Sequence, residues 1–117
     1  MVRGVPLTLH TALEVAAAPA IMAAPFLLGF EPAAGVLTFA LGAVLLGHAI
    51  QLEAPRRTVP LSAHAGIDYA LAAAAAGAGL ALALAAGEPA AGSFLVGVGV
   101  ALTALTASTR FSAPVRA

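Results

Sequence analysis

Two pairs of a histidine and a carboxylic acid are the residues best suited to chemistry in this sequence. Glu14 follows His10 by four positions in the sequence, and Asp68 follows His64 by the same number. In an α-helix this spacing places both side chains of a pair on one face. Two imidazoles and two carboxylates supply nitrogen and oxygen ligands that suit a transition metal. Histidine also titrates near neutral pH, so the same groups are suited to passing protons.

A simpler hypothesis, which the sequence favours, keeps the two pairs apart. Each histidine then hydrogen-bonds the acid of its own helix near the membrane surface, and the pair serves helix packing. The spacing also differs from the Glu-x-x-His motif of di-iron bundles, which weakens the case for a metal. We therefore expect no cofactor, and a transition metal at the four residues is the alternative.

The composition places these residues in a membrane protein. Of the 117 residues, 62% are hydrophobic and 9% are charged, and the mean hydropathy is +1.03. Soluble domains carry roughly a quarter of charged residues. The sequence has no cysteine, which excludes disulfides and thiolate metal sites. A formal net charge of zero argues against nucleic acid as a partner. The high apolar content indicates that the chain lies in the lipid bilayer.

Four segments have the length and apolar character of membrane helices, which need about 20 residues. They are residues 7–30, 33–52, 61–86 and 90–109. Short loops that contain Glu31-Pro32 and Glu88-Pro89 join the first to the second and the third to the fourth. Each proline fits the first turn of the helix that follows. The sequence therefore predicts an all-α membrane fold of two helical hairpins.

Arginine predicts the orientation of these hairpins, because cytoplasmic loops carry an excess of positive charge. The arginines lie before the first segment, between the second and third, and after the fourth; they are Arg3, Arg56, Arg57, Arg110 and Arg116. The two Glu-Pro loops contain none. We therefore expect both termini on the cytoplasmic side.

The two hairpins also resemble each other in sequence. The distance from His10 to His64 is 54 residues, and the two Glu-Pro loops are 57 residues apart. The resulting division is a first repeat at 1–54, a cytoplasmic linker at 55–60, a second repeat at 61–110 and a tail at 111–117. Repeats with the same orientation are related by an axis along the membrane normal. The pseudo-symmetry would place both histidines at one depth.

The stretch "HTALEVAAAPAIMAAPFLLGF" resembles the SPW-repeat membrane proteins of bacteria. Their repeat joins an early His-x-x-x-acid to a later Ser-Pro-Trp and Gly-Phe. Here Ala24 and Phe26 flank Pro25 where the family has serine and tryptophan, and the second half keeps only the histidine and the acid. The resemblance implies a four-span protein, which we expect in the bacterial cytoplasmic (inner) membrane. It implies no particular activity.

Two further groups of residues carry expectations. His48 lies near the end of the second segment and has no equivalent in the second repeat, where Leu105 stands. We expect a solvated helix end there, with membership of a polar cluster as the alternative. Small residues let membrane helices approach closely. Gly42, Gly97 and Gly99 are the expected packing positions.

The sequence shows no catalytic motif, so we do not expect an enzyme. The hypothesis it favours is a structural or accessory subunit of a membrane assembly, either a homo-oligomer or a larger complex. The alternatives are a proton-coupled transporter and a metal-binding membrane protein that use the paired histidines and acids.

Overall fold

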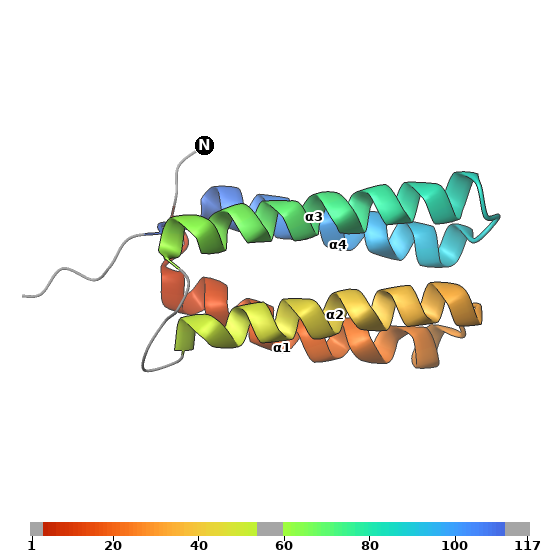
Figure 1. Ribbon diagram of the computed structural model, residues 1–117, viewed down its shortest axis with the longest axis horizontal. Helices are drawn as coiled ribbons and strands as arrows, with labels where there is room; N and C mark the ends of the chain where they lie inside the picture. Colours follow the sequence, from red (N-terminus) through yellow and green to blue (C-terminus); the bar gives the residue numbers. More distant parts are fainter. Residues whose placement is uncertain (1–3, 54–59, 112–117) are drawn as a thin grey trace, which may run out of the picture.

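The chain folds into long helices that run up and down in sequence order (Figure 1). The computed structural model describes residues 4–53 and 60–111. Within them the four helices are α1 (Leu7–Leu28), α2 (Pro32–Glu53), α3 (Leu61–Leu84) and α4 (Pro89–Ser108). Each is long and apolar enough to cross a membrane. The prediction of an all-α membrane fold with four spans is therefore confirmed, with helix ends that differ from the expected ones by at most two residues.

Local chemistry explains where the first hairpin turns. The left-handed backbone of Gly29, with φ 67°, ends α1 two residues before the expected end of the span. Pro32 is the first residue of α2, where a missing N–H costs nothing. The Glu31 carboxylate accepts a hydrogen bond of 3.1 Å from the Ala33 amide and so caps α2. Glu88 precedes α4 without a side-chain cap.

The second hairpin is held by glycines that bring two backbones together. A Cβ atom on Gly79 of α3 would lie 2.6 Å from the Gly92 carbonyl oxygen of α4. A Cβ on Gly99 of α4 would lie 2.7 Å from the Ala72 carbonyl oxygen of α3. Such distances leave no room for a side chain. Gly99 is therefore a packing position as expected, and Gly79 and Gly92 are packing positions that the sequence did not predict.

The first hairpin has one comparable position. A Cβ on Gly42 of α2 would lie 2.7 Å from Met22 Cγ and 3.0 Å from the Ala18 carbonyl oxygen of α1. Gly97 behaves differently, because a Cβ there would meet nothing within 4 Å. The assignment of Gly97 to the contact between α3 and α4 is therefore wrong. It stands two residues from Gly99, about 200° around the helix, and so faces away from α3.

The two hairpins contact each other far less closely than the helices within each hairpin. A small apolar core joins them and consists of Ala18, Ile21, Leu45, Ala72 and Leu102. Among the described residues, no Cα atom of α1 lies within 8 Å of one in α3. Helices α1 and α3 are therefore joined only through side chains. Most other large apolar side chains are exposed, as expected for helices that face lipid.

At one end of the bundle α1 and α3 begin and α2 and α4 finish (Figure 1). At this end the Val5 amide donates to the Ser108 carbonyl at 2.9 Å, and the Arg110 amide donates to the Val5 carbonyl at 2.9 Å. Arg110 is exposed there. The other orientation arginines (Arg3, Arg56, Arg57 and Arg116), most of the 55–60 linker and most of the 111–117 tail lie outside the described residues. The cytoplasmic orientation and the repeat stay predictions.

Candidate metal centre

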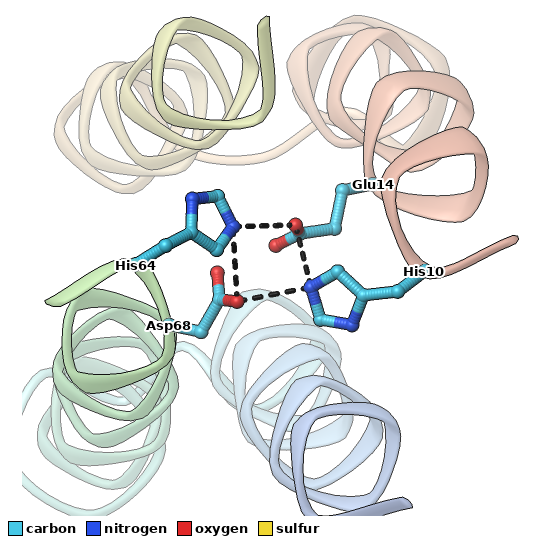
Figure 2. A group of neighbouring side chains, drawn as sticks. All are labelled: His10, Glu14, His64 and Asp68. Carbon is cyan, nitrogen blue, oxygen red and sulfur yellow. Dashed lines mark hydrogen bonds and ion pairs between the residues drawn. The ribbon is translucent and has the colours of Figure 1, made fainter. Parts of the chain in front are cut away.

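The two histidine–acid pairs meet between the four helices, near the end of the bundle where α1 and α3 begin. Figure 2 shows His10 and Glu14 reaching in from α1 and His64 and Asp68 reaching in from α3, two helices that lie diagonally opposite. One donor atom from each of the four residues lies within 4.8 Å of the others. All four side chains are at most 1% exposed. Within each pair, the four-residue spacing places both side chains on one face of their helix. The diagonal placement of α1 and α3 then brings the two pairs together.

The contacts within the quartet run around a ring (Figure 2). The Nε2 atom of His10 lies 2.8 Å from Glu14 Oε1 and 2.9 Å from Asp68 Oδ2. The Nε2 atom of His64 lies 3.3 Å from Glu14 Oε1 and 3.2 Å from Asp68 Oδ2. Each histidine therefore contacts the acid of its own helix and the acid of the other hairpin. The favoured hypothesis of two separate pairs is wrong, because helix spacing alone gives no information on which faces meet.

A threonine just beyond α4 fixes the orientation of the His10 ring. The Thr109 hydroxyl donates to the Leu105 carbonyl oxygen at 2.6 Å, so its own oxygen is left to accept. His10 Nδ1 lies 2.9 Å from that oxygen and donates to it. Because Nδ1 carries a proton, Nε2 presents to the carboxylates either a lone pair or a second proton. The backbone pairing of Val5 with this segment holds the threonine in place.

Three residues of the quartet have a buried polar atom that lacks a hydrogen-bond partner within the described protein: Glu14 Oε2, His64 Nδ1 and Asp68 Oδ1. His48 Nε2 and Thr106 Oγ1 are buried without such a partner as well. Most buried polar atoms in proteins are hydrogen-bonded, and each exception calls for a physical explanation. Two adjacent buried carboxylates also repel each other unless protons or a cation balance their charge. The protein groups alone leave the site incomplete.

His48 of α2 belongs to this cluster, so the expectation of a solvated helix end is wrong. Its ring stacks on the His64 ring, with centroids 3.6 Å apart and planes inclined by 14°. Its Nε2 lies 2.9 Å from Asp68 Oδ1. Neither atom has another hydrogen-bond partner among the described residues. All three histidines of the sequence therefore lie in one buried site.

Apolar groups surround the cluster. The Phe111 ring lies at the end where α1 begins and α4 finishes, with its centroid 5.1 Å from that of His10 and 6.2 Å from that of His64. A cavity of about 440 Å³ between α1, α2 and α4 begins beside the cluster, at Glu14. Glu14 is the single ionisable side chain among the described residues that line it. The cluster side chains themselves are buried, which limits the screening of their charges by water.

No family model matches the chain, and no significant match was found among the curated proteins or the solved structures. The resemblance to the SPW-repeat family stays a prediction.

Proposed function

We propose that this membrane protein binds a divalent transition-metal ion between its two hairpins. The observation that carries the proposal is the convergence of His10, Glu14, His64 and Asp68 on one buried point. Four donor atoms of metal-binding type lie there within 4.8 Å of one another. A metal ion bound by all four would bridge α1 and α3, whose backbones do not touch.

The geometry of the quartet suits a four-coordinate ion. Zinc–nitrogen and zinc–oxygen bonds of about 2.0–2.1 Å place neighbouring ligand atoms of a tetrahedral site about 3.3 Å apart. The four contacts around the ring are 2.8, 2.9, 3.2 and 3.3 Å. The two pairs of donor atoms across the ring lie within 4.8 Å, so a tetrahedral ion would draw these pairs closer together. Imidazole and carboxylate together suit zinc, iron, cobalt and nickel more than magnesium or calcium, which prefer oxygen ligands alone.

Charge balance supports the same conclusion. Two carboxylates and neutral imidazoles carry a net charge of −2, and an uncompensated charge in an apolar interior is costly. One divalent cation neutralises it. Histidines that bind a metal generally donate a hydrogen bond from their other ring nitrogen, which fixes the tautomer. His10 has such a bond, from its Nδ1 to the Thr109 hydroxyl.

The role that follows is structural. Apolar side chains drive helix association weakly in a bilayer, because lipid tails are equally apolar. An ion held by both hairpins would fix their relative position. This role fits the structural or accessory subunit that the sequence favours. Membership of a homo-oligomer or a larger complex in a bacterial inner membrane stays a prediction.

The second candidate is a proton-transfer cluster in a transporter. It is favoured by the contact between His10 Nε2 and Asp68 Oδ2, whose 2.9 Å distance and angles suit a direct hydrogen bond. In this case two protons, not an ion, balance the carboxylates. The two candidates differ in metal content and in proton flux.

The test is a metal analysis of protein purified through a tag without histidine and reconstituted in lipid nanodiscs. We expect about one zinc, cobalt or nickel ion per chain after equilibration and removal of loosely bound ions. The variant His10→Ala, His64→Ala should lose the ion, whereas the loop variant Glu31→Gln should retain it as the matched control. Wild-type protein without tightly bound metal would overturn the proposal. A proton flux in metal-free proteoliposomes, abolished by Glu14→Gln, would then support the second candidate.

A further inference from the structure

The cavity beside the cluster lies in the gap between the two hairpins. Its volume of about 440 Å³ falls within the range of about 300–1,000 Å³ that is typical of ligand sites. Leu45 of α2 is a buried part of its lining, whereas Leu13, Ala17 and Ala101 are exposed parts. The cavity is therefore accessible between α1 and α4, and in a membrane that side faces lipid.

The lining of the cavity runs along the helices. It extends from Leu13 to Ile21 on α1 and from Phe94 to Leu105 on α4. A rise of 1.5 Å per residue makes these stretches about 12 and 16 Å long. Because α1 and α4 run in opposite directions, Glu14 and Leu105 lie at one end of the cavity and Ile21 and Phe94 at the other. Every described lining side chain except Glu14 is apolar, so a hydrocarbon chain that lies along the helices suits this space.

Glu14 gives one end of the cavity a polar atom that lacks a donor. Its Oε1 atom contacts His10 Nε2 at 2.8 Å and His64 Nε2 at 3.3 Å. Its Oε2 atom is buried and has no hydrogen-bond partner among the described residues. A pure hydrocarbon in the cavity would leave that oxygen unpaired, which is costly in apolar surroundings. The occupant should therefore carry a hydrogen-bond donor at the end that meets Glu14.

Charge balance indicates that this donor is uncharged. In the proposed metal site the divalent ion balances the carboxylates of Glu14 and Asp68, and in the second candidate two protons do so. An ammonium group beside them would add an uncompensated positive charge to an apolar cavity. A hydroxyl group donates one hydrogen bond and adds no charge.

We infer that the cavity binds an uncharged amphiphile, a hydrocarbon chain that ends in a hydroxyl group. The chain enters from the bilayer between α1 and α4 and lies along the helices toward Phe94. Its hydroxyl donates to Glu14 Oε2. The inference goes beyond the proposed metal site and shares with it only Glu14 and the balanced charge of the cluster. Glu14 then joins two sites, because Oε1 serves the cluster and Oε2 serves the amphiphile.

Photolabelling in lipid nanodiscs tests the inference with two probes. One is decanol with a photoreactive diazirine on its chain, and the other is the methyl ether of the same molecule, which cannot donate a hydrogen bond. Mass spectrometry locates the label, and labelling is expressed relative to that of α3, whose described residues do not line the cavity. We expect the decanol probe to label the lining stretches of α1 and α4 about two- to tenfold more than the ether, the ratio that one hydrogen bond supplies.

Three variants separate the hydroxyl contact from the space for the chain. Glu14→Met keeps an unbranched side chain but removes the acceptor, so both probes should label it equally. Ala17→Phe, Ala101→Phe fills the cavity without changing the cluster residues and should reduce labelling by both probes. The matched control is Ala16→Phe, Ala104→Phe, at exposed positions that do not line the cavity, and its labelling should equal that of the wild type. Circular dichroism checks the helix content of each variant.

Equal labelling of wild-type protein by the two probes would overturn the hydroxyl ligand, and so would a preference for decanol that persists in folded Glu14→Met. Undiminished labelling of folded Ala17→Phe, Ala101→Phe would place the ligand outside the cavity and overturn the inference as well. The metal content of the same wild-type samples is measured separately. A preference for decanol without a bound ion would overturn only the metal site, and a bound ion without that preference would overturn only the amphiphile.

Discussion

His10 Nδ1 donates a hydrogen bond of 2.9 Å to the Thr109 hydroxyl, which itself donates to the Leu105 carbonyl. This chain of two bonds connects the end of α4 to His10 on α1. It directs His10 Nε2 toward the carboxylates of Glu14 and Asp68. The orientation of the ring is thus set by a residue outside the quartet.

Thr109→Val should therefore weaken metal binding without removing a ligand. Valine has a similar shape but cannot accept from His10 Nδ1, so the ring loses its fixed orientation. Outer partners of this kind typically account for about ten- to hundredfold in metal affinity. A competition titration with a zinc chelator in nanodiscs measures the change. Thr103→Val is the matched control, because Thr103 donates to the Gly99 carbonyl within α4, and its affinity should equal that of the wild type. Equal affinities for the two variants would contradict this role of Thr109.

Metal should stabilise the contact between the hairpins. An ion that binds only the folded state adds about 2.7 kcal/mol to the free energy of unfolding at a concentration 100 times its dissociation constant. Unfolding by sodium dodecyl sulfate, followed by circular dichroism, should shift accordingly when zinc is added. The variant His10→Ala, His64→Ala should show no shift. A zinc-dependent shift that persists in this variant would place the ion elsewhere in the chain.

The contact between α3 and α4 should depend on Gly79 and not on Gly97. Gly79→Leu forces a side chain against the Gly92 carbonyl oxygen, which would lie only 2.6 Å from the new Cβ atom. Overpacking of this kind costs about 1–3 kcal/mol. Gly97→Ala meets open space and gains helix propensity, so it should be neutral or stabilising by up to about 1 kcal/mol. Unfolding in sodium dodecyl sulfate compares the stabilities of the two variants. Equal stabilities would show that the fold does not require the close approach of α3 and α4.

The sequence predicts the helices well because apolar length and Glu-Pro turns are local signals. It also predicts that His10 and Glu14 share a face. It does not predict that they meet Asp68, because the meeting depends on the diagonal placement of α1 and α3. His48 is missed for a related reason: its place near a helix end, without an equivalent in the second half, suggests exposure to solvent.

Other residues are hidden by their ordinary sequence context. Thr109 resembles any polar residue at the end of a span, and its role depends on the pairing of the segment with Val5. Gly79 and Gly92 lie in stretches where alanine and glycine are so frequent that neither is distinctive. Helical period could have excluded Gly97, because it does not share a face with Gly92 and Gly99, which are seven residues apart.

Phe111 should slow the release of metal from the cluster. Its ring lies close to the rings of His10 and His64 at the end of the bundle where α1 begins and α4 finishes. Loss of an aromatic contact worth about 0.5–1.5 kcal/mol would speed ion release about two- to tenfold in Phe111→Ala. Stopped-flow mixing of the zinc-loaded protein with excess chelator measures the rate. Phe26→Ala is the control, because Phe26 is 78% exposed on α1 and lies far along the helix from His10. A release rate in Phe111→Ala equal to that of the control would show that the ring does not cover the site.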